Sequence, residues 1–168
     1  MEYPISLHSY SRCWLHLIWA TLNRERMLFG DPAKKVSAFL SEYAESKGIY
    51  MKINYVNPER VHALIDLPTQ YSIEDIFKLI KGASSHWINQ NRLVAGKFFW
   101  GRGYGVFSVS QSGLAQVARY IAAQEEHHRK RTFLEEYQQL IKRYGFEWRG
   151  EQTVKTVIAS FADSQTPR

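Results

Sequence analysis

The chain has 168 residues, of which 45% are hydrophobic, so it can bury one good core and is too short for two full domains. Lys and Arg number 22 against 16 Asp and Glu, and the resulting net charge of +6 favours a polyanionic partner. Aromatic residues make up 14%, and aromatic faces beside basic groups are typical of proteins that hold single-stranded nucleic acid. The one cysteine, Cys13, excludes an internal disulfide and a multi-cysteine zinc site, so we expect a cytoplasmic protein.

The first predicted element is a strand over residues 13–21, which are rich in Trp, Leu and Ile. This apolar stretch is interrupted by His16 and is too short to span a bilayer, so we expect no membrane association. Asp31 and Pro32 are typical of a helix start, and the apolar residues that follow them recur at helical spacing. They predict a helix over residues 32–47.

Two alternating segments come next and predict a β-hairpin across the turn at Asn57 and Pro58. In residues 49–55 the alternation places Met51, Ile53 and Tyr55 on one side of the strand. Residues 60–67 divide between two faces, with Val61, Ala63, Ile65 and Leu67 on one and Arg60, His62, Leu64 and Asp66 on the other.

The second half of the chain alternates helices with one more strand. Ser72 with Asp75 three residues later predicts the start of a helix that reaches residue 91. The glycine-rich residues 101–105 form either a loop that cradles phosphate or, as the spacing favours, a plain loop with positive backbone φ angles. Residues 106–110 predict a fourth strand, and helices follow from Ser112 and over residues 133–144.

The order strand, helix, strand, strand, helix, strand is the ferredoxin-like, or RRM-like, α+β arrangement. It predicts an antiparallel sheet with two helices on one face and the other face free, plus C-terminal helices that carry Tyr120. We expect a single domain over residues 1–150 and a polar, flexible tail over residues 151–168.

Three residues could act together in chemistry. Tyr120 and Gln124 are four residues apart on a predicted helix and share a face away from its apolar stripe. His62 lies in mid-strand on the face expected to be free of helices, and a neutral imidazole is a good metal ligand. A tyrosine on a helix flank usually only packs, and a lone strand histidine is more often structural. Together, however, the three fit a metal-assisted transesterification through a phosphotyrosine.

Several runs of sequence resemble the insertion-sequence two-hundred-like transposases, single-tyrosine enzymes of the HUH class that include the REP-associated tyrosine transposases. The resemblance extends from the first strand to about residue 148. The runs that carry it are Trp14–Thr21, the Asn23-Arg24-Glu25 turn, Asn57–Ile65, Tyr104–Ser110 and Tyr120–Lys130.

The resemblance implies a ferredoxin-like homodimer that binds hairpins in single-stranded DNA. Tyr120 would attack the scissile phosphate and leave a 5′-phosphotyrosine and a free 3′-hydroxyl. His62 and Gln124 would hold a divalent metal, Mg²⁺ or Mn²⁺. In the dimer, the tyrosine helix of one subunit would complete the active site of the other. Such a protein would work in a prokaryotic cytoplasm, associated with the nucleoid when bound to DNA.

One position departs from the family pattern. The family has histidine, a bulky apolar residue and histidine, whereas this chain has Arg60, Val61 and His62. Arginine stays protonated and has no lone pair, so it cannot ligate a metal, although it can grip a phosphate. Two hypotheses follow: Arg60 stabilises phosphate charge in place of part of the metal, or the site is crippled and the protein only binds DNA. The loss of a ligand favours impaired metal binding.

Other basic residues are candidates for contact with the DNA backbone. Arg102 lies in the glycine-rich loop, and a basic run near the end of the tyrosine helix is either a phosphate contact or a solvated face. That run is His127, His128, Arg129 and Lys130. The sequence therefore predicts a DNA transposase; the alternatives are a catalytically impaired, transposase-derived hairpin-binding protein, or a noncatalytic module that binds nucleic acid on its sheet face.

Overall fold

The computed structural model describes residues 10–146, without the side chains of residues 127–129 and 133. Contacts divide the chain into two compact units, Met1–Glu126 and His127–Arg168. The predicted tail over residues 151–168 lies outside the described residues, so the predicted domain limits stay a prediction. Among residues 10–146, no helix has the length and apolar character that crossing a membrane requires.

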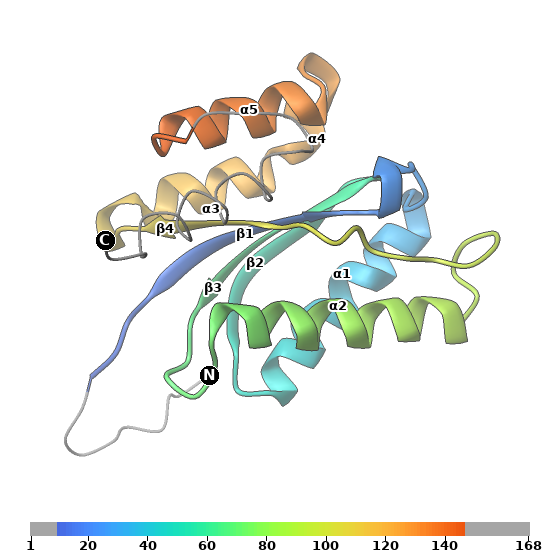
Figure 1. Cartoon of the computed structure of the whole chain (residues 1–168), viewed down its shortest axis with the longest axis horizontal. Coiled ribbons are helices and arrows are strands. Elements are labelled where there is room, and N and C mark those ends of the chain that lie inside the picture. The colour runs from blue at the N-terminus through green and yellow to red at the C-terminus, as the bar shows by residue number, and fades with distance from the viewer. Residues whose placement is uncertain (1–9, 147–168) are drawn as a thin grey trace, which may run out of the picture. The chain divides into compact units, whose positions relative to one another are not determined.

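The first unit contains a four-stranded antiparallel sheet with the order β2-β3-β1-β4 (Figure 1). The predicted succession of strands and helices is confirmed. The strands are β1 (Trp14–Ala20), β2 (Tyr50–Val56), β3 (Arg60–Asp66) and β4 (Gly105–Val109). The helices are α1 (Gly30–Ser46), α2 (Ile73–Gln90), α3 (Leu114–Ala122), α4 (Gln124–Lys130) and α5 (Phe133–Arg143), with short 3₁₀ turns η1 (Leu22–Arg24) and η2 (Gln111–Gly113).

The main core lies between one face of the sheet and helices α1 and α2 (Figure 1). Alternate residues of the two central strands point into it because successive strand side chains face opposite sides. Burying each large apolar side chain here contributes about 1.5–3 kcal/mol. The sheet contributes Leu15, Leu17, Trp19, Val61, Ala63 and Ile65, and the helices contribute Val36, Leu40, Ala44, Ile76 and Ile80.

The opposite face of the sheet is covered in part by α3, which packs against β2 and β3 (Figure 1). The expectation that this face is free was therefore wrong. Leu114 and Ile121 of α3 form a second, smaller apolar cluster with Trp14 and Leu64 of the sheet. The physical reason is that an amphipathic helix must bury its apolar stripe, and the unoccupied sheet face is the available surface.

The predicted alternation in β2 was also wrong at one point. The pairing of β2 with β3 shifts between Met51 and Ile53, so an irregularity there changes which face each side chain occupies. Met51 packs on the main core, whereas Ile53 and Tyr55 pack on the α3 side. Asn54 instead reaches α1, where its side chain binds Ser37. One extra residue in a strand reverses its faces, because the side-chain period is two.

Candidate functional site

Strand β3 presents Arg60 and His62 on the sheet face that α3 covers. In the sheet, His62 lies opposite Ile18 of β1 and Tyr55 of β2, and Arg60 lies opposite Ala20 at the end of β1. Both side chains are buried, with exposed fractions of 0% for Arg60 and 1% for His62. A buried polar group needs hydrogen-bond partners, and the neighbouring elements supply them.

A second buried histidine lies beside His62. The Nε2 atom of His16 in β1 is 3.0 Å from the Nδ1 atom of His62. The two rings are tilted by 30° with centroids 5.2 Å apart.

The guanidinium of Arg60 binds three different side chains. Its Nε donates to the Nε2 of His62 at 3.3 Å, and its Nη2 donates to the Oε1 of Gln124 at 3.4 Å. Its Nη1 forms an ion pair with the carboxylate of Glu59, the preceding residue. A planar guanidinium can make these three contacts at once, because its five N–H donors point in fixed, separate directions.

These contacts determine the tautomer of both imidazoles. Since Nε2 of His62 accepts from Arg60, the ring proton of neutral His62 is on Nδ1, which then donates to Nε2 of His16. The proton of neutral His16 is consequently on its own Nδ1. Hydrogen bonds thus run in one direction, from Arg60 through His62 to His16, and each member fixes the orientation of the next.

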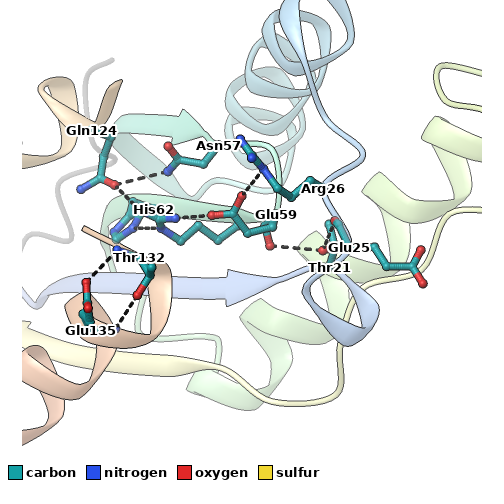
Figure 2. Close-up of polar contacts among 10 residues, drawn as sticks. Thr21, Glu25, Arg26, Asn57, Glu59, His62, Gln124, Thr132 and Glu135 are labelled. Atoms are coloured by element: carbon teal, nitrogen blue, oxygen red, sulfur yellow. Dashed lines mark hydrogen bonds and ion pairs between the residues drawn. The ribbon is translucent and has the colours of Figure 1, made fainter. Parts of the chain in front are cut away.

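The turn before β3 supports this cluster. Glu59, which is 5% exposed, also lies 3.6 Å from the Nε of Arg26 through its Oε2 atom. Asn57 is buried and donates from its side chain to the Oε1 of Gln124 at 3.3 Å. Figure 2 shows Asn57, Glu59, His62 and Gln124 turned toward the same region. The backbone carbonyl of Glu59 accepts from the amide of Thr21, which ties the turn to the end of β1.

Tyr120 lies edge-on to the two histidines. Its ring centroid is 6.1 Å from that of His16 and 6.0 Å from that of His62, with an interplanar angle of 75° in both cases. The helix breaks at Ala123, with φ −89° and ψ 13°, and Gln124 begins α4. Tyr120 and Gln124 thus lie in two successive helices rather than on one. Both still lie near His62, because Gln124 binds Arg60, which binds His62.

The residues present do not fit the divalent metal that the family resemblance implies. The two predicted ligand atoms, Nε2 of His62 and Oε1 of Gln124, both accept hydrogen bonds from Arg60. A divalent ion placed about 4 Å from a guanidinium would be repelled by about 8 kcal/mol at an effective dielectric constant of about 20. Among the residues that the structure describes, no group of three His, Cys, Asp or Glu side chains could hold a metal ion.

Lys81 of α2 binds the backbone of the glycine-rich loop before β4. The ammonium group of the half-buried Lys81 donates to the carbonyl of Gly101 at 2.5 Å and to those of Arg102 and Gly103 at 3.4 Å each. Burial lowers the pKa of Lys81. The predicted positive φ angles were wrong for Gly101 and Gly103. A side chain at Gly101 would instead crowd the Thr21 carbonyl, 3.3 Å from an added Cβ, so the close approach of this backbone favours glycine there.

The predicted DNA-contacting residues lie in different places. Arg102 is exposed in the loop, whereas Arg60 is fully buried. Residues 127–130 form the latter part of α4; Lys130 is exposed, and the side chains of the other three lie outside the described atoms. Their contact with phosphate stays a prediction.

Sequence reasoning identified four members of this site and missed His16, Asn57 and Glu59. The signal for His16 was present, since it has the same parity in its strand as Trp14 and Ile18, opposite to the core residues. A polar residue on the same sheet face as His62 in an adjacent strand was therefore foreseeable. The role of the turn before β3 was not foreseeable, because the sequence alone does not show where the side chains of Asn57 and Glu59 point.

Comparisons with known proteins find relatives among transposases. A family model described as "Transposase IS200 like" matches residues 9–124, a range that contains His62 and Tyr120 and ends at Gln124. The chain is 29% identical over 116 residues to the ISDra2 transposase TnpA of Deinococcus radiodurans, covering 66% of this chain and 83% of that protein. It is 24% identical over 124 residues to the transposase for insertion sequence element IS200 of Salmonella typhimurium, covering 71% and 81%.

Two solved structures share the fold. A Deinococcus radiodurans protein described as a transposase has a TM-score of 0.54 and 29% identity, covering 74% of this chain and 98% of that one. A REP-associated tyrosine transposase bound to a REP hairpin has a TM-score of 0.53 and 13% identity, covering 76% and 74%. The family model spans more than half of the sequence and includes the tyrosine that lies against the buried histidines, so the chain belongs to the IS200-like transposase family.

Proposed function

We propose that this protein cleaves and rejoins single-stranded DNA at hairpin-flanked ends, with Tyr120 as the nucleophile. The observation that carries the proposal is the position of Tyr120, whose ring lies about equally far from the rings of His16 and His62, at 6.1 and 6.0 Å. A phenol beside two buried imidazoles, one of them hydrogen-bonded to a guanidinium, lies next to polar groups that can orient a phosphate.

The proposed reaction is a transesterification. The Oη atom of Tyr120 attacks the scissile phosphorus and loses its proton, while the bond from phosphorus to the 3′ oxygen breaks and that oxygen gains a proton. The products are a 5′-phosphotyrosine and a free 3′-hydroxyl. Rejoining is the reverse attack by a 3′-hydroxyl on the phosphotyrosine. One phosphodiester is exchanged for another, so the step needs no nucleotide cofactor.

The proposed substrate is supported by a relative, whereas the proposed assembly rests on the family resemblance alone. A protein of the same fold has been solved with a REP hairpin, and the net charge of +6 on this chain suits a polyanion. We therefore propose hairpins in single-stranded DNA as the substrate and a homodimer with composite active sites as the active form. Lys130 and Arg102 are exposed basic residues and are proposed to contact the DNA backbone.

A second candidate function is noncatalytic binding of DNA hairpins by a transposase-derived protein. The observation that favours it is the contact of Arg60 with both predicted metal ligands, His62 and Gln124. If the reaction strictly requires a divalent ion between those two atoms, the chain keeps the fold and loses the chemistry. This candidate predicts hairpin binding without a covalent product.

The test is capture of the protein on its own DNA. Labelled single-stranded DNA from the flanks of its gene is incubated with the protein and resolved on a denaturing gel, with a native gel of the same samples to measure affinity. The wild-type protein is expected to form a covalent adduct, and Tyr120→Phe is expected to form none while it binds the hairpin with unchanged affinity. Tyr50→Phe is the matched control, since Tyr50 lies on the same face and packs against Trp14.

An adduct that persists in Tyr120→Phe would contradict the assignment of the nucleophile. Binding of the hairpin without an adduct in the wild-type protein would favour the noncatalytic candidate. Equal loss of the adduct in Tyr50→Phe would mean that the phenylalanine variants disturb packing rather than chemistry.

A further inference from the structure

We infer that Arg60 is the resident cation of this site: its guanidinium takes the position of the divalent metal, and the site works without a metal ion. The part of this inference that concerns metal binding is independent of the proposed function. The part that concerns strand transfer rests on it.

The lone pairs of both predicted ligand atoms point at Arg60. A metal in this family of sites would be held through His62 and Gln124, and the Nε2 and Oε1 atoms of those residues both face the guanidinium, at 3.3 and 3.4 Å. The Oε1 of Gln124 accepts a further hydrogen bond from Asn57. A metal could enter only by displacing Arg60, whose side chain is fully buried and ion-paired with Glu59.

The buried positive charge of Arg60 is compensated by a buried carboxylate. A buried guanidinium is costly unless it is paired, and here the residue immediately before Arg60 supplies a carboxylate that is itself almost fully buried. Arg26, whose side chain is 60% exposed, lies on the outer side of that carboxylate. Simple loss of a histidine ligand would remove a metal-binding group and put no other charge in its place. This site instead contains a cation, its counterion and two acceptors in mutual contact.

Arg60 also holds the neighbouring side chains in fixed orientations. Arg60 orients the amide of Gln124 and fixes the Nδ1–H tautomer of His62, which in turn orients His16. The rings of both histidines adjoin Tyr120. Arg60 is therefore a positioning residue, which brings positive charge and fixed hydrogen-bond geometry to the place where a metal would otherwise bring them.

The first test measures Mn²⁺ binding by the intact protein, from the electron paramagnetic resonance signal of the free ion. The wild-type protein is expected to show no Mn²⁺ binding that depends on His62, so that wild type and His62→Ala give the same signal. The double variant Glu59→Gln/Arg60→His removes the cation with its counterion and adds an imidazole. It is expected to bind Mn²⁺ at least about tenfold more tightly than the wild type, and adding Gln124→Ala should abolish that gain.

A wild-type protein that binds Mn²⁺ in a manner lost in His62→Ala would overturn the inference. This comparison does not depend on the double variant, so it decides the question even if that variant fails to fold. A double variant that folds, as judged by circular dichroism, and gains no Mn²⁺ affinity would also count against it, because the remaining residues would then not form a metal site that Arg60 blocks.

The second test measures the covalent adduct in EDTA and in Mn²⁺. The wild-type adduct is expected to be unchanged by EDTA, whereas that of the double variant should disappear in EDTA and return with Mn²⁺. A wild-type adduct that requires Mn²⁺ would refute metal-independent strand transfer. Absence of an adduct under both conditions would instead contradict the proposed function, and the Mn²⁺ titration alone would then decide the role of Arg60.

Arg60→Lys separates charge from geometry. Lysine keeps the positive charge but lacks the planar fork that contacts His62, Gln124 and Glu59 together. We expect this variant to bind no Mn²⁺ and to form less adduct, with an altered pH profile because the tautomer of His62 is no longer fixed. An adduct yield and a pH profile identical to the wild type would show that Arg60 acts through charge alone and would refute its positioning role.

Discussion

The two faces of β3 are equally buried, and at the end of the strand that carries Arg60 and His62 they are chemically opposite. Toward α1 and α2, the strand presents Val61, Ala63 and Ile65, each with an exposed fraction of 0%. Toward α3 it presents Arg60 and His62, with exposed fractions of 0% and 1%. The first face is stabilised by the removal of hydrocarbon from water, and the second is tolerated because Arg60 and His62 hydrogen-bond to each other and to neighbouring side chains. Alternation of apolar and polar residues therefore did not mark an exposed face here.

The comparison also separates stability from function. The apolar face can lose methylene groups without any change in the chemistry of the site, whereas the polar face depends on complete sets of partners. Removal of one partner there leaves a buried charge, which costs more than removal of both. Substitutions on the two faces should consequently differ in size and in what they affect.

The largest effect on stability is expected when Arg60 is replaced alone. Arg60→Met leaves the buried carboxylate of Glu59 without its main counterion and should lower the free energy of unfolding by about 4 kcal/mol. The double variant Glu59→Gln/Arg60→Met removes both charges and should recover most of that loss. Urea denaturation of the two variants measures the difference. Equal stability of the single and double variants would refute the ion pair as the reason for the cost.

A slightly smaller effect is expected on the apolar face. Ile65→Ala removes a fully buried side chain from the main core and should lower the free energy of unfolding by about 3 kcal/mol, through lost transfer energy and the cavity left behind. At a temperature where the variant is folded, its yield of covalent adduct should equal that of the wild type. A stable but inactive Ile65→Ala protein would show that the two faces are coupled.

A smaller effect on stability is expected at the start of α2, where Ser72 and Asp75 form a capping box. Ser72→Ala should lower the free energy of unfolding by about 1 kcal/mol, because the Ser72 hydroxyl no longer caps the helix. Hydrogen bonds from the side chain and the backbone amide of Ser72 lower the pKa of Asp75 below its usual 3.8.

The sign of the pH dependence at this cap follows from that lowered pKa. The stabilisation by the Asp75 carboxylate is fully present above pH 3.8 and is lost as the pH falls through the lowered folded value. The Ser72→Ala variant should therefore lose less stability in acid than the wild type does. Urea denaturation at neutral pH and below pH 3.8 compares them, and parallel acid losses in the two proteins would contradict this role of Ser72.

The smallest effect concerns Lys81 in alkali. Because burial lowers its pKa below 10.5 in the folded protein, the unfolded chain binds more protons between the lowered value and 10.5. The contribution of Lys81 to the free energy of unfolding therefore rises with pH over that window. Lys81→Met should lack this contribution, and urea denaturation of both proteins at neutral pH and above 10 measures it. A wild-type protein that loses stability relative to Lys81→Met over the window would contradict the direction.

Local patterns predicted most of the fold. Helix α2 was marked by Ser72 and Asp75, which form the predicted capping box, and β3 by its regular alternation. The wrong assignments arose where one residue or one tertiary contact overrides the pattern. The irregularity between Met51 and Ile53 reverses the faces of β2, and no sequence period announces it. Placement of α3 on the sheet depends on long-range packing.

The sequence predicted which residues belong to the site but not the hydrogen bonds between them. Tyr120, Gln124 and His62 were identified from residue type and spacing, and Arg60 from its departure from the family pattern; the structure brings them to one region. The sequence could not show that the guanidinium of Arg60 binds both predicted metal ligands, His62 and Gln124. These contacts depend on the register of β1 and β3 and on the break at Ala123 between two helices, which are tertiary features.

The most direct test of the central claim is to locate the DNA on the protein. The wild-type adduct is digested with nuclease and protease, and the modified residue is identified by mass spectrometry among the ten tyrosines of the chain. The account predicts a nucleotide on Tyr120, beside His16 and His62. A nucleotide on any other residue would contradict the claim that the face of β3 that carries Arg60 is the strand-transfer site.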